Sequence, residues 1–114
     1  NVHYQYTHVV GTSSGNTNDM REAIAMFESG RLNPAAMVTH IGGLNAVVDT
    51  TLDLPKIRGA KKLIYTQIEL PLTAIADFEK LGETDVLFAK LSEITKRHNG
   101  LWSGEAEKYL LSQK

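Results

Sequence analysis

The stretch VVGTSSGNTNDMREA, at residues 9–23, has the character of a strand that passes through a glycine turn into a capped helix. β-Branched and aromatic residues dominate the positions before the first glycine and predict a strand over residues 2–12. The glycines allow backbone angles that other residues resist. Asn16 or Thr17 can cap the following helix, and Asp19 lies in its first turn, at the positive end of the helix dipole.

The strand-to-helix alternation continues as far as residue 66. Apolar residues at helical spacing predict a helix over residues 17–29, which Gly30 ends. A short strand is predicted at residues 37–41, broken by the glycines that follow, and a further strand at residues 61–66. Between these strands the spacing predicts a helix over residues 44–52 with an apolar stripe of Leu44, Val47, Val48 and Leu52. This alternation predicts an α/β fold.

The remaining residues, 67–114, have an all-helical pattern. Pro71 is placed to open a helix that runs to Leu81. Three helices are predicted within residues 72–112, packed as a cover on the α/β part because isolated short helices are marginal in water. Their predicted caps are Thr84 or Asp85 for the second and Ser103 for the third, and Trp102 is the predicted anchor.

Composition sets limits on the class of protein. The chain has 114 residues, enough for one domain with a modest core, and a formal net charge of −1. That charge creates no global field that would attract nucleic acid or a membrane surface. Without cysteine, the chain can form neither a disulfide nor a thiolate metal site. No apolar run approaches the length of about 18 residues that a membrane-spanning helix needs.

The residue types carry little catalytic signal. The four histidines are not spaced as metal ligands. His98 is best explained as a cation at a helix C-terminus, and His40 as a structural hydrogen-bonding group. The turn at residues 11–15 could hold an anion at a helix start, but it lacks the nucleotide-binding motifs and is favoured as a plain turn. Residue types alone predict an α/β domain fragment with a helical tail and do not give its function.

Three stretches together resemble a known family. They are HVVGTS at residues 8–13, AIAMFESGRLNP with the nearby MVTH at residues 23–40, and GAKKLIYT at residues 59–66. Their order and spacing resemble the carboxyl-terminal end of medium-chain, zinc-dependent alcohol and polyol dehydrogenases over about residues 4–66. The tail, through IELPLTAI at residues 68–75 and LWS at residues 101–103, looks most like a sugar-phosphate or polyol branch, of the L-sorbose 1-phosphate reductase type.

The resemblance implies a division of the chain. Residues 1–13 would be the last strand of a Rossmann nucleotide-binding domain. Residues 14–66 would be the carboxyl-terminal segment of a GroES-like catalytic domain, and residues 67–114 a helical extension. The chain is therefore expected to be a piece of a longer protein whose amino-terminal part is absent.

The resemblance also implies an activity for that longer protein. The family transfers a hydride between the nicotinamide of NAD or NADP and an alcohol or ketone, here a sugar, a polyol or a sugar phosphate. Zinc polarises the substrate oxygen in this family. Its ligands and all catalytic residues would lie outside this chain, which is expected to be inactive alone. The expected enzyme is a cytoplasmic homo-oligomer that binds neither nucleic acid nor membrane.

Two cofactor contacts are implied within this chain. A strand-end backbone segment resembles the one that holds the nicotinamide carboxamide in the family, and it falls on His8, Val9, Val10 and Gly11. A basic residue before the closing strand resembles one that reaches the cofactor pyrophosphate, and it falls on Lys62. Lys61 is the alternative if the register slips by one.

Two other hypotheses remain open from the sequence. The chain could be a self-contained, non-catalytic α/β binding or interaction module that uses its helical tail. Such a module should bury residues 4–10 among its own strands, whereas a fragment should leave them with an open edge or an exposed apolar face. The chain could also be an enzyme of another class that uses His40 and Asp49, which requires the two side chains to lie within hydrogen-bond reach.

Overall fold

The computed structural model describes residues 10, 11 and 13–114. The chain divides into two compact units, Asn1–Asn33 and Pro34–Lys114, and each is considered by itself. The predicted first strand lies almost wholly outside the described residues, so its edge and burial stay predictions. Among the described residues, no helix combines the length and apolar character that a membrane crossing needs.

The described residues of the first unit form the helix α1 (Thr17–Glu28), as the sequence predicts. Its N-terminus is held by a reciprocal capping box. The Asp19 backbone N–H donates to Asn16 Oδ1 at 3.0 Å, and the Asn16 backbone N–H donates to Asp19 Oδ2 at 2.8 Å. Gly30 follows the helix with φ of +73°, the left-handed conformation that a C-terminal glycine adopts without strain. Both predicted ends of this helix are confirmed.

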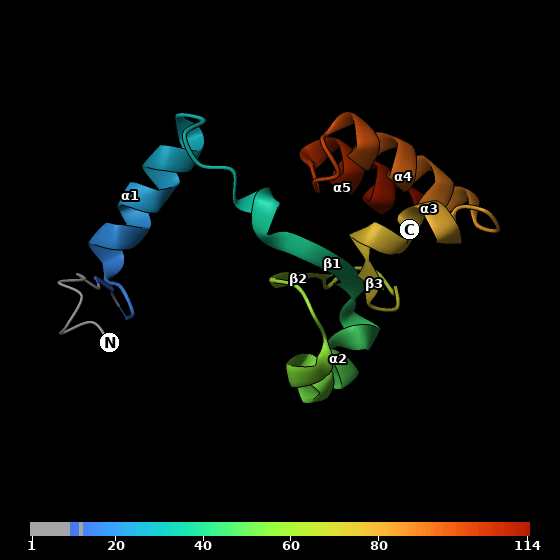
Figure 1. The fold of residues 1–114 in the computed structure, drawn as a ribbon, viewed down its shortest axis with the longest axis horizontal. Helices are drawn as coiled ribbons and strands as arrows, with labels where there is room; N and C mark the ends of the chain where they lie inside the picture. Colours follow the sequence, from blue (N-terminus) through green and yellow to red (C-terminus); the bar gives the residue numbers. More distant parts are fainter. Residues whose placement is uncertain (1–9, 12) are drawn as a thin grey trace, which may run out of the picture. The chain divides into compact units, whose positions relative to one another are not determined.

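The second unit is built on a three-stranded sheet in the order β2-β1-β3 (Figure 1). The central strand β1 (Val38–Gly43) pairs in parallel with β2 (Lys61–Tyr65) and antiparallel with β3 (Thr73–Ala74). The parallel pair is joined by a crossover of three short helical segments, η2 (Leu44–Ala46), α2 (Val47–Asp53) and η3 (Leu54–Lys56). The predicted α/β class is confirmed.

The central strand differs from the prediction at both ends. Met37 belongs to a 3₁₀ turn, η1 (Pro34–Met37), and the strand continues through the two glycines that were expected to break it. The reason is a close approach of two backbones. A Cβ on Gly43 would lie 2.4 Å from both the Ile68 carbonyl oxygen and the Leu70 nitrogen. Gly43 therefore marks a place where another segment lies against the strand, a role glycine often has within sheets.

The predicted helix that opens at Pro71 is wrong. Proline biases the residue before it toward extended angles, and the Leu70 carbonyl accepts a bond from the Gly43 N–H at 2.7 Å. The chain stays extended into β3, where Thr73 pairs with Ile41. Helical structure begins only at η4 (Ile75–Asp77) and α3 (Phe78–Leu81). Residues 67–114 are therefore not wholly helical, because they supply a strand to the sheet.

The last two helices agree with the prediction. They are α4 (Val86–Arg97) and α5 (Gly104–Gln113). The Asp85 side chain accepts from the Leu87 N–H at 2.9 Å, and the Ser103 side chain accepts from the Ala106 N–H at 3.2 Å. Figure 1 shows α3, α4 and α5 gathered together, away from α2.

The core of the second unit lies between the sheet and these three helices. Trp102 is buried, and its Nε1–H donates to the Tyr65 hydroxyl at 2.9 Å, so the predicted anchor and its need for an acceptor are confirmed. The Phe78 ring packs edge-on against Trp102, with ring centroids 6.2 Å apart. The residues after position 66 do more than cover the core, since they supply most of it: Ile68, Leu70, Phe78, Phe88, Leu91, Ile94, Trp102, Ala106 and Leu110 join Ile41 and Tyr65.

Candidate functional site

The predicted cofactor contacts fall in different parts of the chain. His8 and Val9 lie outside the described residues. Val10 and Gly11 belong to the first unit, where both are exposed and outside regular structure. Lys62 belongs to the second unit. A site shared by these residues therefore stays a prediction.

Lys62 lies at the start of β2, and its ammonium group turns back onto its own loop. Nζ donates to the carbonyl oxygens of Gly59 at 2.8 Å, Ala60 at 3.2 Å and Arg58 at 3.3 Å. A lysine has three N–H donors, so these carbonyls occupy all of them. In this conformation Lys62 stabilises the loop before β2, and it must release at least one carbonyl to reach a phosphate.

The loop that Lys62 holds packs directly on β1. Gly59 has φ of +96°, and a Cβ there would lie 2.5 Å from Thr39 Oγ1. Thr39 is the extra residue where the β1–β2 register shifts, and its hydroxyl donates weakly to the Lys61 carbonyl at 3.4 Å. The strand bulge, the glycine turn and the lysine thus form one local arrangement. Glycine is required at residue 59 on grounds of both space and backbone angle.

His40 is the titratable neighbour of Lys62, and the sequence did not predict this proximity. The two residues are partners across the parallel ladder. His40 Nδ1 lies 2.9 Å from Thr39 Oγ1. Burial lowers the pKa of His40, the Lys62 charge lowers it further, and Asp77 partly opposes both effects. At neutral pH this imidazole is therefore uncharged. Only strand register reveals the pairing, and it is a non-local property.

Asp49 does not join His40. The hydrogen bonds of the described residues give His40 a single ring partner, Thr39, and none links it to Asp49. The hypothesis of an enzyme that uses these two side chains as an acid–base pair requires that contact. The described residues show no such contact, so the geometry that this hypothesis requires is not present.

A shallow pocket of about 330 Å³ opens beside β2. It is lined by α2 on one side and by the start of β2 on the other, including Thr50, Lys61 and Lys62. Lys61 is exposed, and its ammonium makes no hydrogen bond or ion pair with the described residues. Two lysines at the edge of one pocket favour an anionic ligand. The Lys61 ammonium has N–H donors available for such a ligand, whereas the Lys62 ammonium is held in place by its three carbonyl partners.

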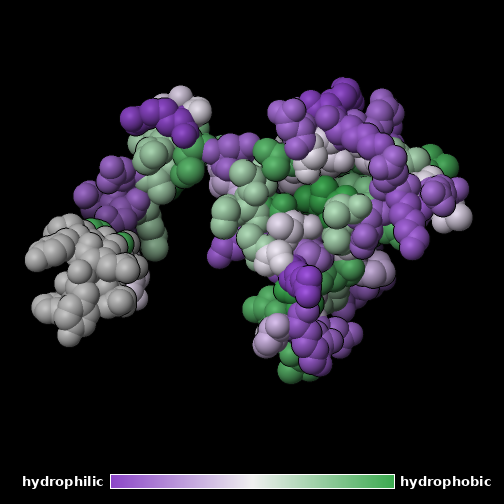
Figure 2. Space-filling view, in the orientation of Figure 1, coloured by the Kyte–Doolittle hydropathy of each residue, from purple (hydrophilic) through white to green (hydrophobic). Residues whose placement is uncertain are grey.

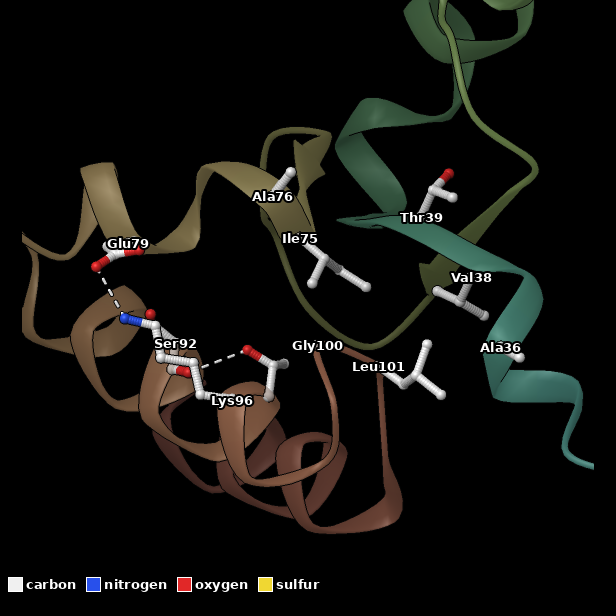
Figure 3. Close-up of a pocket in the computed structure, with 11 residues that line it drawn as sticks. Ala36, Val38, Thr39, Ile75, Ala76, Glu79, Ser92, Lys96, Gly100 and Leu101 are labelled. Carbon is white, nitrogen blue, oxygen red and sulfur yellow. Dashed lines mark hydrogen bonds and ion pairs between the residues drawn. The ribbon is translucent and has the colours of Figure 1, made fainter.

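A second pocket, of about 370 Å³, lies between β1, η4 and α4 (Figure 3). Its charged residues neutralise each other, because Lys96 Nζ lies 2.8 Å from Glu79 Oε1. The bond from Lys96 lowers the pKa of the Glu79 carboxyl. The Thr95 hydroxyl is also occupied, since it donates to the carbonyls of Leu91 and Ser92. The pocket contains none of the predicted site residues and has no nucleophile paired with a base.

No cluster of three or more histidine, cysteine, aspartate or glutamate side chains within residues 10, 11 and 13–114 could hold a metal ion. Nothing in this part of the chain therefore fits a zinc site.

Comparison with known proteins identifies three bacterial proteins that are similar to nearly the whole of this chain. The YggP protein of Escherichia coli (strain K12) is 58% identical over 113 residues, which is 99% of this chain and 27% of that protein. Mannitol-1-phosphate 5-dehydrogenase of Aliivibrio fischeri (strain ATCC 700601 / ES114) is 50% identical over 111 residues, 97% of this chain and 26% of that protein. L-Sorbose 1-phosphate reductase of Klebsiella pneumoniae is 51% identical over 111 residues, 97% of this chain and 25% of that protein.

These proteins are homologues of the chain. The resemblance to a polyol and sugar-phosphate oxidoreductase is thereby confirmed. The chain spans about a quarter of the length of these relatives. No family model and no solved structure matches it.

Proposed function

We propose that the chain is a segment of a longer NAD(P)-dependent oxidoreductase that interconverts the alcohol and ketone forms of a sugar or polyol phosphate. One observation carries the proposal. Two homologues whose names describe oxidoreductases of mannitol 1-phosphate and L-sorbose 1-phosphate match the chain at 50–51% identity over 97% of its length. The similarity covers nearly every element of both units, so it does not rest on one short motif.

The geometry around Lys62 is consistent with a contact between this residue and the cofactor. The proposed contact is with the pyrophosphate, an anion that a charge-assisted bond from lysine suits. Its ammonium is held by three carbonyls and so has a defined position at the edge of the pocket beside β2. Exchange of one carbonyl for a phosphate oxygen would retain the other two bonds. Lys61 can approach the same anion from the neighbouring position.

The hydride step itself needs groups that the described residues do not supply. Nicotinamide carries the hydride when bound, and zinc, if the longer protein uses it, would polarise the substrate oxygen. Neither group is held by a complete site in this part of the chain. The proposed contribution of the segment is to complete the fold and to contact the cofactor.

The test is an assay of the longer polypeptide that contains this segment. Purified protein would be supplied with mannitol 1-phosphate or sorbose 1-phosphate and each nicotinamide cofactor, with the unphosphorylated compounds as controls. The proposal expects turnover that depends on the phosphate, followed through the absorbance of the reduced cofactor. Folded protein that turns over no combination of cofactor and sugar phosphate would contradict it, and would favour a non-catalytic binding module.

A further inference from the structure

The crossover helix α2 turns its apolar side outward. Leu44, Val48 and Leu52 follow one another at four-residue spacing through η2 and α2, so they lie on one side of the helical segment. Their exposed fractions are 55%, 68% and 73%. We refer to these three residues as the outer stripe. Hydrophobic side chains gather over α2 in Figure 2.

The inner side of the same segment carries smaller and more polar groups. Ala46 and Thr50 are buried, and the Thr50 hydroxyl has no hydrogen-bond partner among the described residues. An ordinary surface helix has the reverse arrangement, with its apolar stripe toward the core and its polar side toward water. Single exposed leucines are common, but a continuous stripe of large apolar residues marks a surface that packs on something else.

We propose that the outer stripe is the surface on which the remainder of the longer polypeptide packs. The proposal rests on the part of the proposed function that makes this chain a segment of a longer protein. About three quarters of each homologue lies outside the matched region, so the length of additional chain is ample. All three side chains are large and apolar, so the proposed contact is with an apolar surface of that remainder.

The occupant can be identified by photocrosslinking in the full-length protein. A benzophenone amino acid would replace Leu52, and in a matched control it would replace Val86, which is 82% exposed at the start of α4. The proposal expects an intramolecular crosslink from Leu52 to a peptide outside residues 1–114, and none from Val86. A crosslink within residues 1–114, a crosslink between two copies, or no crosslink at all would overturn it.

A pair of charge substitutions gives an independent readout. Val48 and Val86 both lie in the first turn of an α-helix, so Asp affects the helix dipole in the same sense at both positions. In the full-length protein, Val48→Asp should lower Tm by several degrees, while Val86→Asp should leave it unchanged. Equal effects would overturn the proposal. A protein that crosslinks as expected but reduces no sugar phosphate would contradict only the proposed function; an active protein without the crosslink would contradict only the docking surface.

Discussion

At the scale of single residues, Tyr65 connects the sheet to the last helix. Its hydroxyl donates to Glu107 Oε2 at 2.6 Å and accepts from Trp102 Nε1 at 2.9 Å. Burial, and then the bond to Glu107, raise the pKa of Tyr65 well above its ordinary value, so it stays protonated and remains a donor. The need of Trp102 for an acceptor could be predicted from residue type. The identity of that acceptor could not, since it lies 37 residues away.

Tyr65→Phe should destabilise the chain by about 1–3 kcal/mol, because it leaves the buried Trp102 N–H without its acceptor. The free energy of unfolding would be measured by urea denaturation. Tyr109→Phe is the matched control, since the Tyr109 side chain packs against the core but its hydroxyl makes no hydrogen bond with the described residues. That change should stay within about 0.5 kcal/mol. Equal losses in the two variants would show that the hydroxyl network contributes nothing.

Lys62→Ala should weaken dinucleotide binding by the longer enzyme by about 1.5–3 kcal/mol, the value of a hydrogen bond to a charged group. Titration calorimetry would measure the affinity, and thermal unfolding the loss of the three loop carbonyl bonds. Lys61→Ala is the control and should change affinity less. If Lys62→Ala lowers Tm while only Lys61→Ala weakens binding, the cofactor contact belongs to Lys61 and Lys62 has a purely structural role.

His40 should make stability depend on pH. Its folded pKa lies below the ordinary value of 6.5, so the unfolded chain binds the proton more readily. Its effect on stability is therefore absent above about pH 6.5, and stability falls as the pH drops through the folded pKa. Denaturant titrations of the wild type and of His40→Gln across this range would measure it. Curves of the same shape for both proteins would show that His40 is not responsible.

At the scale of elements, local signals predicted α1, α4 and α5 well but placed a helix wrongly at Pro71. The caps at Asn16, Asp85 and Ser103 act within three residues of themselves, so the sequence shows them directly. β3 was missed because a two-residue strand exists through its pairing with β1, which no local pattern shows. The orientation of α2 was missed for a related reason: periodicity shows that a helix has an apolar side, but not where that side faces.

The two glycines that end β1 provide a test of the close approach. Gly43→Ala places a Cβ against the backbone of residues 68–70, which cannot move without disturbing the sheet, and should cost at least about 1–3 kcal/mol. Gly42→Ala meets Ile64 Cδ1 at 3.2 Å, a side-chain end that can shift, and should cost less. Urea denaturation of the two variants would establish the order. A smaller loss at Gly43 would contradict the proposed reason for the glycine.

At the scale of the whole molecule, the sequence predicts the fold class but does not predict which residues come together in the cofactor site. Alternating strands and helices have a sequence period, and that period predicted the α/β fold. A binding site depends on residues brought together from different segments, such as His40 and Lys62 across a strand pair. Its other predicted members, including Val10 and Gly11, belong to a separate compact unit. Their relationship to Lys62 is a matter of tertiary arrangement, which periodicity does not describe.

The 114-residue chain should by itself show no oxidoreductase turnover with sugar phosphates and either nicotinamide cofactor. The reason is that the chain spans only about a quarter of the length of its homologues, so most of the cofactor and substrate site of the proposed enzyme would lie outside it. The measurement is the same absorbance assay, with the longer polypeptide as the positive control at equal concentration. Turnover by the isolated chain would show that a quarter of the homologues' length is sufficient for catalysis, and would refute the segment interpretation.

The position of Leu110 has a consequence for synthesis on the ribosome. This fully buried residue packs in the same core as Ile41 of the central strand, which precedes it by 69 positions in the sequence. The early strands therefore leave the exit tunnel long before their packing partners are translated. Until α5 emerges, the apolar side chains of β1 and β2 that pack in this core stay exposed, and chaperones and proteases can bind them. A stop codon placed directly before α5 would thus yield a polypeptide with an incomplete core, which we expect the cell to degrade.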